Sequence, residues 1–233
     1  MMTSQDIIGL VIIISYFVLA GILGITISTK AKIGDETKRK ILHSFGFLSY
    51  PIFLFLFDSW IVSCITALVL GIGSFILISI LEKYKPSFLL FFKERHKGEM
   101  KTTILIIFFV FALSIIASWG CLFTSLLGLL AIFSWGFGDM FAALIGKTFG
   151  KHHYKIQILS KKTIEGTIAC FISIYLVSMI ILFAYHYSPL ISLLFPLILA
   201  SGGAIIELLS LEGLDSFFMP IGIFLFSLLL YVI

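Results

Sequence analysis

Charged residues are scarce in this chain of 233 residues, because Asp, Glu, Lys and Arg together make up only 12% of it. The longest hydrophilic stretches span about twenty residues, too few to bury a core of their own, which excludes a separate soluble domain. The mean hydropathy of +1.17 suits a chain surrounded mostly by lipid. We therefore attribute the net charge of +4 to membrane topology and expect no nucleic-acid partner.

Cysteine is also rare, and Cys64, Cys121 and Cys170 each stand alone in an apolar run. Isolated cysteines of this kind behave as small buried hydrophobic residues, so we expect no redox role, and their spacing gives no metal site. The chain contains neither a Walker A pattern nor a Rossmann fingerprint. It also shows no convincing internal repeat.

Long runs of Ile, Leu, Phe and Val fill most of the sequence, and each crossing of a bilayer needs about 20 such residues. These runs lack the alternation of a barrel strand, and helices satisfy their own backbone groups in lipid. The sequence predicts an all-α polytopic integral membrane protein, a single transmembrane catalytic domain over 1–233, with about eight helices (seven to nine). The predicted helices span roughly 7–28, 41–57, 60–81, 104–119, 121–146, 168–184, 190–209 and 218–233.

All sixteen Lys and Arg residues lie in three segments, from Lys30 to Lys40, from Lys83 to Lys101 and from Lys147 to Lys162. With eight crossings, these segments follow the first, third and fifth helices and share one side of the membrane. The positive-inside rule predicts that this side is cytoplasmic and that both termini face outward. We expect no cleaved signal peptide, because the first apolar run is too long and lacks a basic start.

A few acidic residues interrupt the apolar runs, where an ionisable group costs a few kcal/mol or more unless it is paired or hydrated. Asp58 falls in a break between two predicted helices and is expected to be a solvated turn residue. Asp139 lies inside a predicted helix, roughly 12 Å of helical rise before Lys147. Glu207 lies near the cytoplasmic end of the 190–209 helix.

His43, Lys162 and Glu165 fall at the same cytoplasmic side in this topology. The convergence of these residues with Asp139 and Glu207 predicts a site in the cytoplasmic leaflet. Each residue has a simpler explanation when taken alone. Asp139 could pair with a lysine, Glu207 could simply end a helix, and His43 could be a satisfied residue at the membrane interface.

The segment 138–167 is the richest in chemistry, because a helical carboxylate precedes a basic loop interrupted by glycines. Magnesium prefers one or two carboxylates together with phosphate oxygens, and lysine neutralises phosphate as a point charge. The pattern predicts an integral-membrane site for a phosphorylated, metal-bound ligand. The competing interpretation is that the basic loops simply attract anionic lipid.

The residues GDMFAALIGKTFGK, followed by KKTIEGT, resemble the signature of the CTP-dependent lipid kinases: dolichol kinase, phytol kinase, other polyprenol kinases and fungal-type diacylglycerol kinase. These enzymes share features with membrane phosphatidate cytidylyltransferases. Three further matches extend the resemblance to most of the chain: KRKILHSFG at 38–46, KGEMKTT at 97–103 and AIIELLSLEGLDSFFMP at 204–220. The chain departs from phytol kinase-like members at Leu214, Asp215 and Ser216, where they often have Asp-Asp-Asn.

The resemblance implies transfer of the γ-phosphoryl group of CTP to the hydroxyl of a membrane lipid alcohol, an isoprenoid or a diacylglycerol, with Mg²⁺ as cofactor. It implies that Asp139 binds the metal and that Glu165 orders the loop or makes a second metal contact. His43 or Glu207 would then orient or deprotonate the hydroxyl. The residues expected to bind the nucleotide are Lys147, Lys151, Lys161, Lys162, Gly146, Gly150, Gly166, Arg39 and Lys40.

Two alternatives remain open at this point. A cytidylyltransferase would use the same metal and loop, but lipid phosphate would attack the α-phosphorus of CTP and pyrophosphate would leave. A transporter of a phosphorylated lipid or anion would move its ligand without nucleotide turnover. The sequence identifies neither the lipid alcohol nor the oligomeric state.

Overall fold

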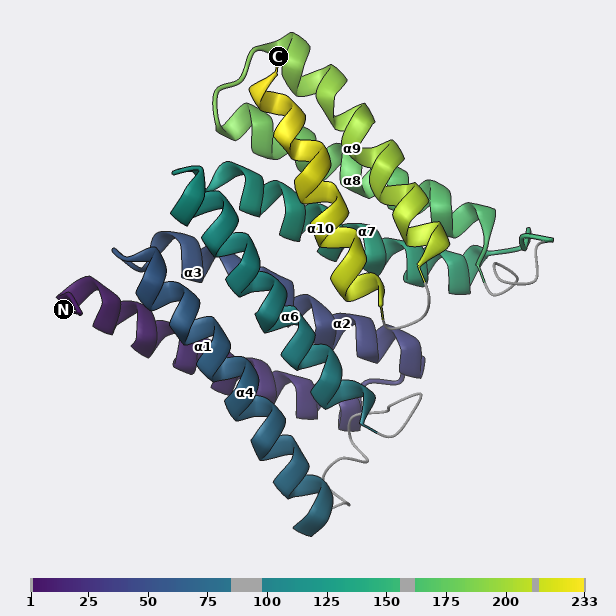
Figure 1. Ribbon diagram of the computed structural model, residues 1–233. Coiled ribbons are helices and arrows are strands. Elements are labelled where there is room, and N and C mark those ends of the chain that lie inside the picture. Colours follow the sequence, from purple (N-terminus) through teal and green to yellow (C-terminus); the bar gives the residue numbers. More distant parts are fainter. Residues whose placement is uncertain (1, 85–97, 156–161, 211–213, 233) are drawn as a thin grey trace. The chain divides into compact units, whose positions relative to one another are not determined.

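The computed structural model describes residues 2–84, 98–155, 162–210 and 214–232, and the regular elements in these ranges are helices (Figure 1). The all-α prediction is therefore confirmed for the part of the chain that is described. The chain divides into two compact units, Met1–Phe123 and Thr124–Ile233, and each is described here by itself. That both belong to a single catalytic domain stays a prediction.

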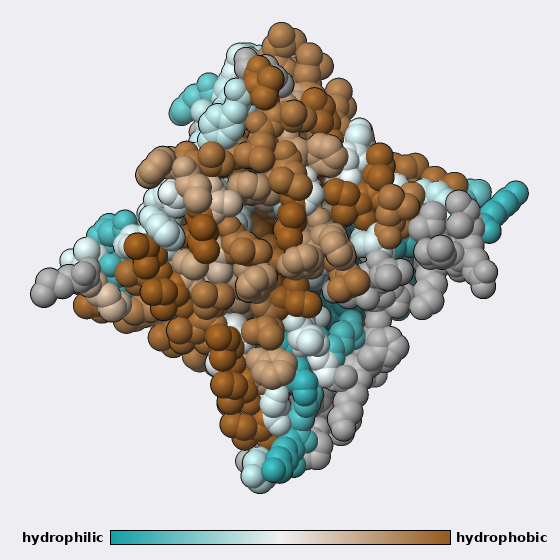
Figure 2. All heavy atoms as spheres, viewed as in Figure 1, coloured by the Kyte–Doolittle hydropathy of each residue, from teal (hydrophilic) through white to brown (hydrophobic). Residues whose placement is uncertain are grey.

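Six helices in the described ranges are long and apolar enough to cross a membrane. Many of their large hydrophobic side chains are exposed, and Figure 2 shows hydrophobic side chains over most of the visible surface. This is the surface expected of helices that face lipid rather than water. The six are α1 (Ser4–Lys30), α4 (Trp60–Tyr84), α6 (Glu99–Ile115) with its π-helical continuation η1 (Ile116–Cys121), α7 (Leu126–Phe149), α8 (Ile164–Ala184) and α9 (Pro189–Leu209).

The other two predicted spans form shorter elements. The predicted 41–57 helix is divided into α2 (Asp35–Leu48) and α3 (Tyr50–Phe55). Pro51 stands in the first turn of α3 and has no N–H to donate to an earlier carbonyl, which removes one backbone hydrogen bond at the division between α2 and α3. At the other end of the chain, α10 (Asp215–Ser227) continues into the 3₁₀-helix η3 (Leu228–Tyr231).

In the first unit, α4 packs closely against α6. A Cβ atom on Gly71 would lie only 2.8 Å from Cβ of Phe108, so the absent side chain lets the two helices approach. The rings of Tyr50 and Phe111 pack beside this crossing with their centroids 4.9 Å apart and their planes tilted by 60°. The Tyr50 hydroxyl donates a hydrogen bond of 2.8 Å to Ser114 Oγ, which satisfies both polar groups inside an apolar core.

The start of α1 is tied to the connection between α3 and α4. Thr3 caps α1 and forms a capping box with Asp6. The Thr3 hydroxyl donates to Asp58 Oδ2 at 2.7 Å, and the Asp58 N–H donates to Asp6 Oδ1 at 3.0 Å. Asp58 is exposed, as expected of a turn residue. The bonds to Thr3 and Asp6 place the start of α1 and the start of α4 at the same end of the unit.

In the second unit, α7 packs against α8 and α10, and α8 packs against α9 (Figure 1). Glycines permit this close packing. A Cβ on Gly138 of α7 would lie 2.8 Å from Met219 and 2.9 Å from Ile174. A Cβ on Gly203 of α9 would lie 2.6 Å from the same Ile174 and 3.3 Å from Ile223. All four helices therefore meet at one level of the unit, around Ile174.

One end of the second unit is built from hydroxyl groups. The hydroxyls of Ser125, just before α7, and Tyr185, just after α8, lie 2.5 Å apart. Burial raises the pKa of the Tyr185 phenol, so this hydroxyl stays neutral at ordinary pH. Ser188 caps α9 by accepting a hydrogen bond from the Ile191 N–H at 3.4 Å. The described lysines of the unit lie at the opposite end.

Candidate functional site

The end of α7 lies directly against the start of α8. A Cβ on Gly166 would lie 2.8 Å from the carbonyl oxygen of Ala142, and one on Gly146 would lie 2.9 Å from Thr163 Oγ1. Thr163 caps α8 by accepting from the Gly166 N–H at 3.2 Å. Gly146 and Gly166 are thus needed for two helix backbones to touch. Their predicted contact with phosphate is a separate role that stays a prediction.

The loop after α7 folds back onto the start of α8. Gly150 ends α7, and the Ile164 N–H donates to the His152 carbonyl at 2.9 Å. Glu165 holds this loop, because its carboxylate lies 2.7 Å from His152 Nδ1 and accepts from the His152 N–H at 3.3 Å. Of the two roles expected for Glu165, the structure shows loop ordering.

Lys162 and Glu207 form an ion pair between the residue preceding α8's cap and the last turns of α9. The Lys162 ammonium donates to Glu207 Oε1 at 2.6 Å and also to the Glu207 backbone carbonyl. Glu207 is only 7% exposed, so a cation is needed to offset the cost of burying its charge. Glu207 is therefore a partner of lysine, a relation that sequence reasoning missed.

Asp139 is 3% exposed and lies deep in α7, beside Gly138. Gly138 faces Ile174 of α8, and Ile174 follows Glu165 by nine residues, about 13 Å of helical rise. At the start of α8, this far from Ile174, Glu165 is hydrogen-bonded to His152. The structure therefore does not bring the two predicted metal ligands, Asp139 and Glu165, together.

Asp139 and Glu207 lie at more similar depths. Gly203 of α9 also faces Ile174, and Glu207 follows Gly203 by four residues, about 6 Å toward the lysine-rich end. Asp139 follows Gly138, which faces Ile174, by only one residue. Asp139 and Glu207 therefore differ by about one helical turn in their depth along the helix axes. The second unit thus holds two buried acids near one cationic end.

The cations at this end differ in their exposure. Lys147, in the last turn of α7, and Lys151, in the loop, are exposed and can reach an anionic ligand. Lys162 is half-buried and held by Glu207. Lys161 lies outside the described residues. The lysines predicted to bind phosphate therefore divide into exposed residues and one that already has a carboxylate partner.

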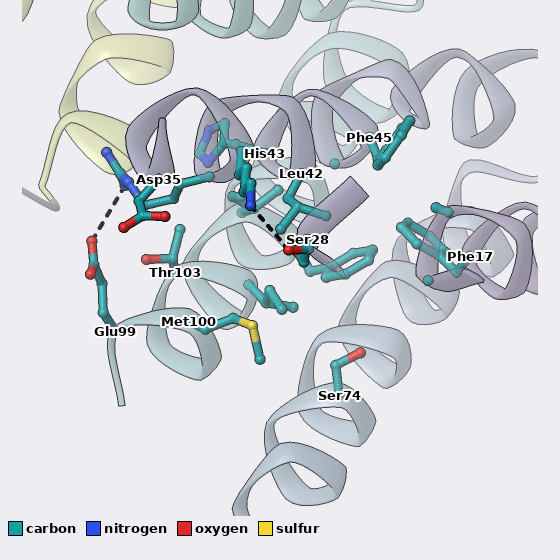
Figure 3. Close-up of a pocket in the computed structure, with 18 residues that line it drawn as sticks. Phe17, Ser28, Asp35, Leu42, His43, Phe45, Ser74, Glu99, Met100 and Thr103 are labelled. Carbon is teal, nitrogen blue, oxygen red and sulfur yellow. Dashed lines mark hydrogen bonds and ion pairs between the residues drawn. The ribbon is translucent and has the colours of Figure 1, made fainter. Parts of the chain in front are cut away.

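The remaining predicted residues, His43, Arg39 and Lys40, lie on α2 in the first unit. Arg39 forms ion pairs with Glu36 at 2.5 Å and with Glu99 at 3.4 Å, and Lys40 is buried. His43 lines a cavity in this unit (Figure 3). Their convergence with the residues of the second unit stays a prediction.

The donor set of the described residues suits a magnesium site with few protein ligands. Among the described residues, no group of three or more His, Cys, Asp or Glu side chains could hold a metal ion. Magnesium needs one or two carboxylates when phosphate oxygens and waters complete its shell, and a buried Asp139 fits that requirement. Sequence reasoning missed Glu99 and Thr103 as cavity residues, although both lie in the KGEMKTT motif.

Comparison of the chain with protein-family models, with curated proteins and with solved structures gave no match. The family resemblance of the four motifs thus stays a prediction from the residues themselves.

Proposed function

We propose that this protein is a CTP-dependent lipid kinase that phosphorylates the hydroxyl group of a membrane lipid alcohol. The observation that carries the proposal is the buried carboxylate of Asp139, 3% exposed in an apolar helix whose last turn carries the exposed Lys147. A buried acid among membrane helices marks a functional site, because its burial is costly. Lysines at the end of the same helix add the charge that a polyphosphate needs.

In the proposed reaction, the lipid hydroxyl oxygen attacks the γ-phosphorus of CTP and forms a new P–O bond. The bond between the γ-phosphorus and the β–γ bridging oxygen breaks, and CDP leaves with the electron pair. The hydroxyl proton passes to a protein base. The resemblance assigns this base to His43 or Glu207, and the Glu207 carboxylate accepts a hydrogen bond from Lys162.

Asp139 would hold Mg²⁺, with Glu207 about one turn away in depth. The bound ion would neutralise charge that develops on the transferred phosphoryl group. Lys147 and Lys151 would pair with the phosphate oxygens, and Lys162 would hold Glu207 in place. Gly146 and Gly166 keep α7 and α8 in contact, which fixes Lys147 relative to the loop.

We further propose eight crossings with the basic ends cytoplasmic and both termini outside. The 14 residues of α2 and the 6 of α3 rise about 30 Å together, with the charged first turns of α2 included. The bond between Thr3 and Asp58 supports this, because it brings the end of α3 back to the start of α1. The 13 residues of α10 with the 4 of η3 rise about 27 Å.

The test is incubation of the purified protein in lipid nanodiscs with γ-labelled CTP, Mg²⁺ and a panel of lipid alcohols. We expect a labelled lipid monophosphate and an equal amount of CDP. A parallel reaction with α-labelled CTP and phosphatidate tests for cytidylyltransferase activity instead of kinase activity. Label in CDP-diacylglycerol with release of pyrophosphate would instead establish a cytidylyltransferase, and absence of label from every lipid would contradict both.

A further inference from the structure

The first unit contains a cavity of about 270 Å³ between α1, α2, α4 and α6 (Figure 3). Its lining changes in character along its length. Asp35, Glu99 and Thr103 lie at one end, on the first turns of α2 and α6, and Phe17 and Phe45 lie at the other (Figure 3). A cavity with one polar and one apolar end matches a ligand with a polar head and a hydrocarbon chain.

The polar end is balanced in charge. Two cations, Lys38 and Arg39, and two anions, Asp35 and Glu99, line the cavity among the described residues. Arg39 is paired with Glu99, and the Lys38 ammonium donates to the Ser28 carbonyl at 3.0 Å. Among these described residues, an anionic head group would meet two carboxylates and two cations that already bond to other groups. A neutral hydroxyl suits this end better, because it can both donate and accept hydrogen bonds.

The size of the cavity limits how much of a ligand's hydrocarbon chain it can enclose. Pockets for drug-sized ligands measure roughly 300–1,000 Å³, so about 270 Å³ is at the small end of that range. It can enclose a hydroxyl head and the first carbons of one chain. A diacylglycerol brings two ester groups and two chains to the same point, and a cavity of this volume is too small to enclose them.

We propose that this cavity binds a single-chain lipid alcohol, with its hydroxyl among His43, Glu99 and Thr103 and its chain against Phe17 and the α6 residues beyond. The assignment of this alcohol as substrate rests on the proposed kinase function, but its binding does not. The charge balance also favours a neutral alcohol over the lipid phosphate that a cytidylyltransferase would need.

Two glycines provide a matched pair of variants for a test. Gly21 of α1 lines the cavity, whereas Gly73 of α4 does not, and neither has a neighbouring atom within 4 Å of where a Cβ would be. The Cβ of a leucine has open space at either position, and leucine improves the helix propensity. Gly21→Leu therefore fills the cavity, and Gly73→Leu adds the same side chain to a helix surface outside it. Ser74→Leu is a second variant that narrows the cavity from α4.

The experiment uses the full chain in nanodiscs without nucleotide and a farnesol analogue that carries a diazirine near its hydroxyl. We expect the crosslink to map to cavity residues by mass spectrometry. Labelling should fall at least tenfold in Gly21→Leu and Ser74→Leu and remain unchanged in Gly73→Leu. Unlabelled farnesol should compete at least tenfold better than diacylglycerol or farnesyl phosphate.

Equal competition by diacylglycerol or farnesyl phosphate would overturn the choice of ligand. Labelling that persists in both cavity variants, or that maps elsewhere, would overturn the site. Asp139→Asn separates this proposal from the kinase proposal, because it should retain the crosslink while turnover is lost. A cavity crosslink without CTP turnover by the wild type would contradict the kinase alone.

Discussion

The Lys162 ammonium lies 2.6 Å from Glu207 Oε1, which joins the residue before α8's cap to the last turns of α9. The side chains are 22% and 10% exposed, so solvent screens the pair only weakly. Lys162 also donates to the Glu207 backbone carbonyl, so its ammonium contributes to the end of the helix as well as to the carboxylate. One lysine thus connects two helices of the second unit.

Removal of this lysine should destabilise the protein. Lys162→Met leaves the Glu207 carboxylate buried without its cation, at a cost of roughly 1–3 kcal/mol in the free energy of unfolding. The double variant with Glu207→Leu should lose less than the sum of the two single changes. Denaturant unfolding in detergent measures all three. Strictly additive losses would mean that the two side chains do not interact in the folded protein.

The contact between α7 and α8 predicts that Gly166 tolerates no side chain. Gly166→Ala would bring a Cβ within 2.8 Å of the Ala142 carbonyl oxygen, so the helices must separate. We expect a loss of about 1–3 kcal/mol, as for overpacking elsewhere. Gly73→Ala is the control, because open space surrounds that position. It should be neutral or stabilising by about 0.5–1 kcal/mol, and equal effects at both positions would contradict the helix contact.

Asp139→Asn keeps the shape of the side chain and removes its charge. We expect the rate of lipid phosphorylation to fall at least about a hundredfold, or about 2.7 kcal/mol in the activation free energy. Asp58→Asn is the control, since Asp58 lies in the exposed connection between α3 and α4. Initial rates at saturating Mg²⁺ and CTP measure the effect. Near-normal turnover in Asp139→Asn would exclude the carboxylate from metal binding.

The proposed orientation predicts opposite labelling of the two ends of the second unit. In a chain with Cys121→Ser, which removes the exposed native thiol, Ser188→Cys should react with an impermeant thiol reagent on intact cells. Lys155→Cys should react only after the membrane is permeabilised. Mass spectrometry of the labelled protein measures both. The reverse pattern would place the lysine-rich end outside, away from cellular CTP.

Much of the fold could be predicted from the sequence, because long apolar runs are typical of helices that cross a membrane. The division of α2 from α3 was not predicted, although Pro51 is visible in the sequence. The mean hydropathy of a long segment is hardly changed by a break of one residue in the helix. The end of α6 was also placed too early. Its π-helical turn continues to Cys121, where Gly120 lets the chain pack against the Trp60 ring.

The candidate site was predicted less completely. Hydropathy identified Asp139 and Glu207 as costly residues, and both are buried. The partner of Glu207 could not be predicted, because Lys162 and Glu207 are 45 residues apart and only the packing of α8 on α9 brings them together. Gly146 and Gly166 were interpreted as phosphate-binding residues because glycine is used both for ligand approach and for helix contact, and sequence alone does not separate these uses.

The bond between Thr3 and Asp58 affects the order in which the protein can be assembled during synthesis. Its two residues are 55 positions apart, so the first helix enters the membrane before the partner of its own cap has been made. Until the ribosome has passed Asp58, the Thr3 hydroxyl and the second carboxylate oxygen of Asp6 have only water or lipid head groups to bind. The start of α1 can therefore be fastened only after α3 and its connection to α4 have been made.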